Sequence, residues 1–85
     1  MNEIRTIDTT YITGSKTIEL IEVIDESTSP IRTNYLYMYN YEGYHFRLFL
    51  DIINLSNFLC NLESICIEFD EEDELDEYLL NMEVI

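Results

Sequence analysis

The clearest pattern in the chain is an alternation of side chains on both sides of a short turn, within residues 35–50. Tyrosine occupies every odd position from 35 to 41, and a second alternating run covers residues 44–50, after Glu42-Gly43. Two such runs separated by a short turn containing glycine are typical of a β-hairpin. The second run has two distinct faces, one with Tyr44, Phe46, Leu48 and Leu50, and the other with His45, Arg47 and Phe49.

Two further segments have the composition of strands. Residues 17–24 are rich in β-branched side chains, which favours a strand, although part of the spacing also fits a helix. Residues 65–69 are short and β-rich and predict another strand. Residues 25–34 hold the only proline and predict a loop. Residues 1–16 are polar and rich in threonine, and we expect either a flexible arm or a short edge strand.

Two segments show helical spacing. Asp51 is placed to cap a helix that begins near Ile52, with an apolar stripe at Ile52, Leu55, Leu59 and Leu62 and with Phe58 beside it. An amphipathic helix near the end of the chain has its apolar side at Leu75, Tyr78, Leu79 and Met82. Acidic residues precede it, where the helix dipole favours negative charge, and either Asp70 or Asp73 is expected to cap it.

These elements predict an α+β fold in a single domain, residues 1–85. The expected order is β-β-β-α-β-α, with an antiparallel sheet of three to four strands and the helices on one face. That arrangement would bury one shared core of Leu36, Met38, Phe46, Leu48, Leu55, Leu59 and Leu79.

The charge balance changes the picture from an ordinary small domain to a strongly acidic one. Hydrophobic residues make up 47% of the chain, which is too many for a disordered segment. Yet the chain contains 18 acidic residues and only 4 lysine and arginine residues, which gives a net charge of −14. Residues 48–85 carry eleven acids and no base. Direct binding to nucleic acid or to an anionic membrane is therefore disfavoured, because both would repel the chain.

The cysteines, the N-terminal residues and the length of the apolar runs indicate the cellular compartment. Cys60 and Cys66 both lie in apolar surroundings, and we expect two buried free thiols in a reducing cytosol. The first five residues lack the features of a secretory signal, and no apolar run approaches the roughly 18 residues of a membrane span. A cytoplasmic protein is expected, in the host cytoplasm if the chain is encoded by a phage.

Candidate catalytic chemistry is sparse. His45 is the only histidine, and no phosphate-binding glycine-rich loop exists. Cys60 and Cys66 lack the spacing of a zinc or redox site. Asp70, Glu72 and Glu74 alternate like calcium ligands, but the glycine that a calcium loop requires is missing. We therefore expect no enzyme activity, no cofactor and no metal.

The acids and the tyrosines together predict a surface for binding a basic protein. Exposed tyrosine beside carboxylates is suited to arginine and lysine on a partner, whereas the same tyrosine stripe is also compatible with a half-buried position under a loop or helix. The predicted partner-binding residues are Glu42, Asp70, Glu71, Glu72, Asp73, Glu74, Asp76, Glu77, Tyr37 and Tyr39.

Over residues 17–85 the sequence resembles the small acidic anti-CRISPR proteins of phages, in particular those that inhibit Cas9. The resemblance lies in Tyr41-Glu42-Gly43 at the hairpin turn, in the acidic segment from Phe69 to Leu75, and in the closing segment from Tyr78 to Ile85. The Tyr-rich strand and the two cysteines depart from that pattern. The resemblance implies a three-stranded antiparallel sheet followed by helices. It also implies an acidic surface that imitates DNA, on which Glu42 and Asp70 to Glu74 contact basic residues of the nuclease.

The functional hypothesis is an inhibitor that mimics the charge of DNA or RNA and blocks a host defence protein that binds nucleic acid, such as a CRISPR nuclease. An antitoxin or immunity protein that covers a basic nuclease site is the alternative within the binding class. A small structural or regulatory subunit is the alternative outside it.

Overall fold

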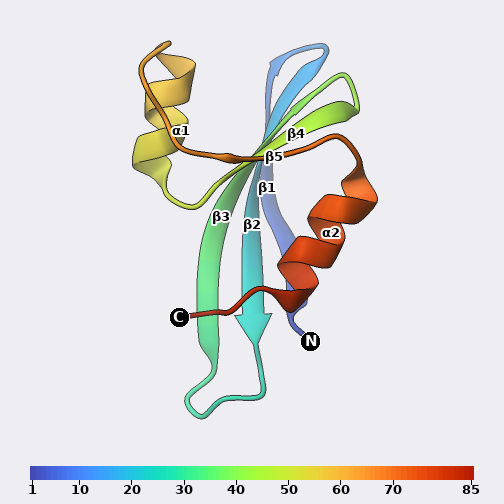
Figure 1. Cartoon of the computed structure of the whole chain (residues 1–85), viewed down its shortest axis with the longest axis vertical. Helices are drawn as coiled ribbons and strands as arrows, with labels where there is room; N and C mark the ends of the chain where they lie inside the picture. The colour runs from blue at the N-terminus through green and yellow to red at the C-terminus, as the bar shows by residue number, and fades with distance from the viewer.

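The computed structural model describes all residues from 1 to 85 and consists of one five-stranded antiparallel sheet and two helices (Figure 1). Each strand pairs with its neighbour in the chain, so the sheet order is β1-β2-β3-β4-β5. Helix α1 connects β4 to β5, and helix α2 follows β5. The elements are β1 (Glu3–Thr13), β2 (Lys16–Asp25), β3 (Arg32–Tyr41), β4 (Tyr44–Phe49), α1 (Ile52–Leu59), β5 (Ile67–Phe69) and α2 (Glu72–Asn81).

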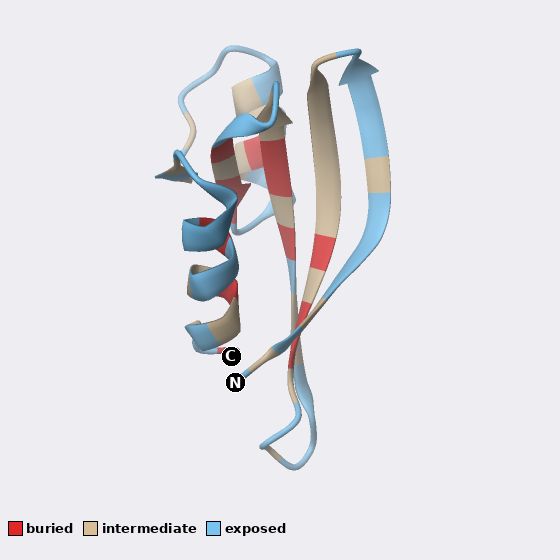
Figure 2. Ribbon diagram, turned by 90° about the vertical axis from the view of Figure 1, so that its right-hand side faces the viewer, coloured by how far each residue is buried: buried red, intermediate tan, exposed pale blue.

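The α+β class and the antiparallel sheet are confirmed, but the expected number and order of strands are wrong. The additional strand is β1, which pairs with β2 from Glu3 opposite Ile24 to Thr13 opposite Lys16. No residue of β1 is buried, because β1 is an edge strand (Figure 2). Of the two expectations for residues 1–16, the edge strand is therefore right, but the strand is long, and its apolar residues do not alternate regularly with polar ones, so the sequence carries no signal for its length.

Asn2 holds the start of β1 against the end of α2. Its side-chain Nδ2 donates hydrogen bonds to the carbonyl oxygens of Leu79, at 3.0 Å, and Met82, at 2.8 Å. Its backbone nitrogen donates to the oxygen of Leu80 at 3.0 Å. The last carbonyls of a helix have no partner within the helix, so Asn2 supplies what α2 lacks.

The predicted hairpin is confirmed as β3 and β4. Glu42 and Gly43 both have positive φ, at 56° and 80°, which is the backbone of a two-residue turn that follows the twist of the strands. The predicted strands at 17–24 and 65–69 are present as β2 and the short β5.

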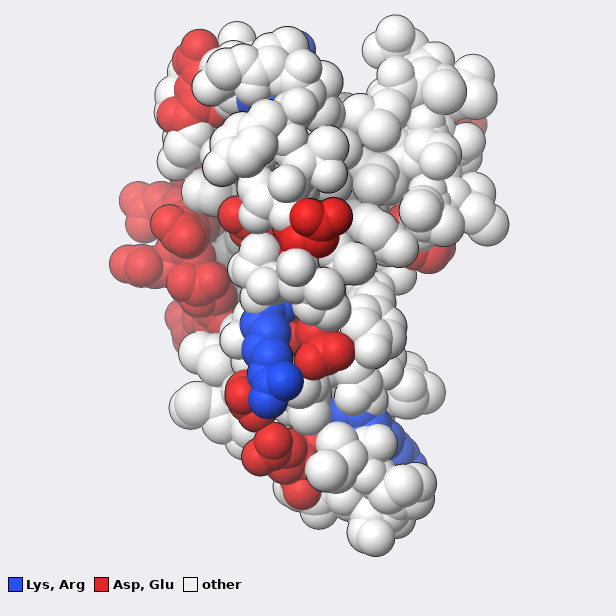
Figure 3. Space-filling model, turned by 180° about the vertical axis from the view of Figure 1, so that it is seen from behind, with Lys and Arg blue, Asp and Glu red and all other residues white.

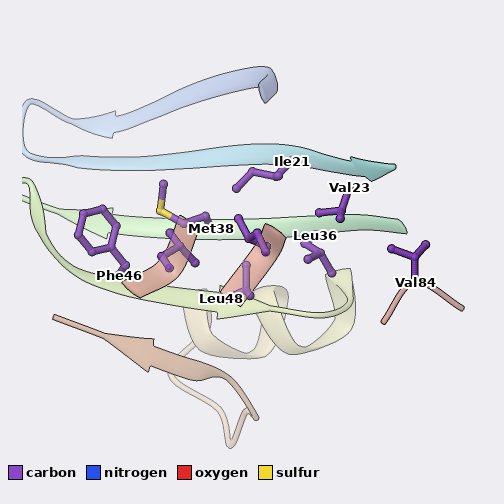
Figure 4. Close-up of a cluster of buried hydrophobic side chains, with 9 residues drawn as sticks. Ile21, Val23, Leu36, Met38, Phe46, Leu48 and Val84 are labelled. Carbon is purple, nitrogen blue, oxygen red and sulfur yellow. The ribbon is translucent and has the colours of Figure 1, made fainter. Parts of the chain in front are cut away.

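The two helices lie on opposite faces of the sheet, so the expectation of helices on one face is wrong. Leu36 and Met38 on β3 face α2, in a core with Leu48, Leu75 and Leu79 (Figure 4). Tyr37, Tyr39 and Tyr41 of β3 lie on the side of α1, where Tyr39, Phe49 and Leu55 form a smaller cluster. The single core expected from the sequence is therefore divided between the two faces.

Helix α1 begins as predicted but buries less than predicted. Asp51 caps it, since its Oδ1 accepts a hydrogen bond from the backbone nitrogen of Asn54 at 2.8 Å. Leu55 is the only buried residue of α1, and Ile52, Leu59 and Leu62 of the expected stripe are exposed. The helix packs mainly on β3 and β4, at one end of the sheet, which leaves these three aliphatic side chains exposed.

Both thiols are free, as expected, but neither is buried: Cys60 ends α1 and is exposed, and Cys66 is half-buried. The expected cap of α2 is also wrong. Glu71 occupies the N-cap position of α2 without a side-chain hydrogen bond to the helix, so neither Asp70 nor Asp73 caps it. Neither helix is long and apolar enough to cross a membrane.

Candidate partner-binding surface

Strand β5 and helix α2 gather the acidic residues on one side of the molecule. Strand β5 pairs antiparallel with β4, so it runs towards the β3–β4 turn and delivers the start of α2 to that end of the sheet. Leu75 and Leu79 anchor α2 on the sheet, which turns the remaining positions outward. We call the exposed carboxylates of this segment the acidic face; it consists of Asp70, Glu71, Glu72, Asp73, Glu74, Asp76 and Glu77.

The acidic face has almost no compensating positive charge. Figure 3 shows it as a crowded group of carboxylates at the left edge of the molecule, over α2. The imidazole of His45 approaches it, with Nδ1 3.6 Å from Oδ1 of Asp70, and no lysine or arginine forms an ion pair with it. No carboxylate from Glu71 to Glu77 forms an ion pair. The negative field at α2 is therefore available to a partner.

Three of the four lysine and arginine side chains make contacts elsewhere, and the fourth, Arg32, lies opposite Asp25 at the start of β3. Nη1 of Arg47 lies 2.9 Å from Oε1 of Glu68, and the Arg47 guanidinium lies 5.0 Å from the centre of the Phe58 ring. Nη2 of Arg5 lies 3.1 Å from Oε1 of Glu3, and Nζ of Lys16 lies 5.4 Å from the centre of the Tyr41 ring. Among these contacts only that of Arg47 with Phe58 joins the sheet to α1, and none of them involves a carboxylate of the acidic face.

Glu19 on β2 is a carboxylate that the sequence analysis did not single out. It faces α2 in the same row as the buried Ile21 and Val23. Partial burial, followed by the nearby charges of Glu72 and Asp76, raises the pKa of Glu19 above its ordinary value. The sequence signal that could have identified Glu19 is its spacing, because Glu19, Ile21 and Val23 occupy alternate positions and therefore share one face of the strand.

Glu42 lies in the β3–β4 turn, at the end of the sheet where α2 begins. Its carboxylate accepts a hydrogen bond from the Tyr44 hydroxyl at 3.0 Å, and this bond raises the pKa of Tyr44. His45, in the same hairpin, contacts Asp70. The structure thus brings the predicted Glu42 to the same end of the molecule as the start of the acidic face.

The tyrosine stripe is partly covered, and the expectation of a partner-facing Tyr39 is wrong. Tyr39 is buried under α1, with the centre of its ring 5.0 Å from that of Phe58. Tyr37 is half-buried, and Tyr35 is the exposed member of the stripe, with 53% of its surface accessible. The helix that covers Tyr39 was predicted, but the face that it covers was not.

A groove runs beside α2 and adjoins the acidic face. Its volume is about 1150 Å³. Apolar and aromatic side chains from both the sheet and the helix line it, and carboxylates of α2 stand at its side; among these residues are Tyr35, Leu50, Phe69, Tyr78, Glu74 and Glu77. The groove offers an apolar contact directly beside negative charge.

The structure brings no group of three or more histidine, cysteine, aspartate or glutamate side chains into an arrangement that would hold a metal ion. Comparisons with protein-family models, with curated proteins and with solved structures found nothing that matches this chain.

Proposed function

We propose that this protein is an acidic inhibitor that binds a host defence protein by imitating the charge of DNA or RNA, with a CRISPR nuclease as the first target to test. The observation that supports the proposal is the acidic face, where seven exposed carboxylates stand together almost without counter-charge. Clustered charge of one sign lowers folding stability. Attraction of an oppositely charged partner is a function that would explain why the protein carries such a cluster.

The charge density of α2 is close to that of a duplex. Five carboxylates lie within the six residues from Glu72 to Glu77. At ~1.5 Å of rise per residue these residues span about 9 Å, or one charge per ~1.8 Å of axis, compared with ~1.7 Å for double-stranded DNA. A groove that neutralises phosphates with lysine and arginine would therefore meet a similar density of negative charge on α2.

The chemistry of recognition follows from the side chains present. Carboxylates accept charge-assisted hydrogen bonds from arginine and lysine, including the arginines with which such nucleases read a short duplex motif. The groove beside α2 would receive an apolar side chain of the partner next to those ion pairs, with Tyr35 and Leu50 as its exposed walls.

The test is a competition between this protein and duplex DNA for a purified CRISPR nuclease. We expect mutually exclusive binding, and an affinity that falls as ionic strength rises. Simultaneous binding of the protein and DNA to one nuclease would rule out mimicry.

A matched pair of variants separates the acidic face from net charge. Asp76→Asn with Glu77→Gln removes two charges from the acidic face, and Glu26→Gln with Glu63→Gln removes two exposed charges elsewhere; each pair changes the net charge from −14 to −12. The first pair should weaken binding by about tenfold or more, since each lost charge-assisted bond is worth roughly 1.5–3 kcal/mol. Equal losses from both pairs would mean that only net charge matters.

The acidic face also fits a second target class, a nuclease toxin whose basic active site it would cover. A toxin gene beside the coding gene would favour this antitoxin or immunity role, and inhibition of that toxin by the purified protein would establish it. If no basic nucleic-acid-binding protein is recovered as a partner, a structural or regulatory subunit is the remaining hypothesis.

A further inference from the structure

Helix α1 and the segment after it expose large aliphatic side chains at the end of the molecule away from α2. We call this set the apolar face; it consists of Ile52, Ile53, Leu59, Leu62 and Ile65, whose exposed fractions lie between 47% and 78%. Contiguous apolar surface of this kind on a small protein marks an interaction site. Only one side of α1 meets the sheet, through the buried Leu55, so Ile52, Ile53 and Leu59 remain exposed.

The backbone after α1 adds two of these side chains to the same lobe. The chain reverses at Asn61, which has a positive φ of 58°. The backbone nitrogen of Leu62 then donates to the oxygen of Asn57 at 2.7 Å, and that of Ile65 donates to Oδ1 of Asn54 at 2.9 Å. The returning segment therefore lies along α1, as Figure 1 shows. These hydrogen bonds hold the apolar face in one fixed arrangement.

The apolar face is also the neutral end of a highly charged molecule. Residues 52–62 contain no charged side chain, although the whole chain carries a net charge of −14. In Figure 3 the upper right lobe, which corresponds to α1, is almost free of charged atoms, whereas the carboxylates over α2 crowd the opposite edge. Asp51 and Glu63 flank the neutral segment in the sequence.

The charge distribution decides between the partners that an apolar surface accepts. An anionic membrane would repel the chain, and no lysine or arginine lies in the neutral segment to offset this. A basic protein surface would lose the hydration of its charged groups against aliphatic side chains that offer no counter-charge. A second copy of this chain offers a matching apolar face, and it can approach there with the least repulsion.

We propose that the protein forms a twofold-symmetric dimer in which α1 of one copy packs against α1 of the other through the apolar face. In a twofold interface each copy contributes the same patch, so the aliphatic side chains of one apolar face meet the same side chains of the other. Ser56 lies between Ile52 and Leu59 on the outer side of α1 and lets the two helices approach closely. Because α1 and α2 occupy opposite faces of the sheet, both acidic faces stay exposed in the dimer.

The experiment is sedimentation equilibrium of the full chain over a range of concentrations, in reducing buffer so that no disulfide through Cys60 contributes. The wild type should be a dimer that dissociates on dilution. Ile53→Asp and Leu62→Asp should each weaken the dimer by about tenfold or more, as expected for anchors at an apolar interface. Both side chains are exposed, so neither substitution removes a core contact, and circular dichroism checks the fold.

Ile31→Asp is the matched control. Ile31 is 59% exposed in the loop between β2 and β3, at the end of the molecule opposite α1 in Figure 1. This variant adds the same charge and should dimerise as the wild type does. A wild type that is monomeric at all concentrations would overturn the proposal. So would a dimer that Ile53→Asp and Leu62→Asp leave unchanged, or one that Ile31→Asp disrupts equally.

Discussion

Among single residues, Glu19 shows how the acidic face reaches into the body of the fold. Its side chain lies on the same face of β2 as the core residues Ile21 and Val23. It lies close to the charges of Glu72 and Asp76 on α2. Partial burial and these like charges both disfavour its ionised form, and the pKa of Glu19 is raised. When ionised, Glu19 therefore opposes the docking of α2.

Replacing Glu19 with glutamine should stabilise the protein. A carboxyl whose folded-state pKa is raised binds its proton more tightly in the folded state, so the wild type loses stability as pH rises from the ordinary value of 4.5 through the folded-state pKa. Glu19→Gln has no such proton to lose and should be more stable at neutral pH, by up to about 1 kcal/mol because water screens a partly exposed group. Thermal unfolding across this pH range measures the difference.

Glu63→Gln is the control for that measurement, because it removes an exposed charge that lies outside the acidic face. It should change the melting temperature less than Glu19→Gln does. If Glu19→Gln destabilises the protein at neutral pH, ionised Glu19 must make a favourable contact that the raised pKa does not reflect.

Among the elements, the sequence predicts α2 in full, but α1 and β1 only in part. Helix α2 has apolar residues on one side and acids on the other, and its buried Leu75 and Leu79 match the prediction. The sequence predicts α1 and its cap, but the aliphatic residues of α1 are spread over more than one side, so the pattern does not tell which of them meets the sheet. An edge strand is one of the two expectations for residues 1–16, but the apolar residues of β1 do not alternate regularly with polar ones, so its length and register could not be predicted.

The docking of α1 should depend on Phe58. An isolated eight-residue helix is too short to be stable in water, so α1 relies on Leu55 and on the contacts of Phe58 with Tyr39 and Phe49. Phe58→Ala should destabilise the protein by about 2–3 kcal/mol, below the range for a fully buried phenylalanine. Amide hydrogen exchange should accelerate selectively in residues 52–59, with α2 little affected.

Tyr78→Ala is the comparison for that experiment, since Tyr78 is a half-buried aromatic of α2 whose ring lies 5.6 Å from that of Phe69. It should accelerate exchange in α2 and leave α1 as it is. Uniform acceleration in both variants would mean that the two helices unfold together with the sheet.

For the whole molecule, the uneven distribution of charge along the sequence becomes, after folding, an uneven distribution of charge over the surface. The excess of acid in residues 48–85 was apparent from the sequence, and the acidic segment from Asp70 to Glu77 was predicted as the site. The sequence did not indicate that α1 and α2 would separate to opposite faces, because that depends on which rows of β3 each helix covers. The burial of Tyr39 under α1 and the position of Glu19 beside α2 both follow from which face of the sheet each helix covers.

This spatial asymmetry predicts that salt acts differently on folding, on dimerisation and on partner binding. Raising ionic strength from about 0.01 M to 0.15 M shortens the screening length from ~30 Å to ~8 Å, so repulsion among the carboxylates weakens. The melting temperature should rise over this range, and the proposed dimer should tighten, because two copies of charge −14 repel each other less. Binding to a basic partner should weaken, because the same screening acts on an attraction.

The Asp76→Asn, Glu77→Gln variant tests whether the acidic face is the source of the effect on folding. It should be more stable than the wild type at low salt, and its melting temperature should rise less steeply with salt, because fewer like charges remain on α2 to be screened. The Glu26→Gln, Glu63→Gln variant, with the same net charge, should keep a steeper dependence. A wild-type melting temperature that is flat or falls with added salt would show that the carboxylates of α2 are far enough apart, or hydrated enough, not to oppose folding. The acidic face would then not lower the folding stability, and this argument for a role of the acidic face in partner binding would be lost.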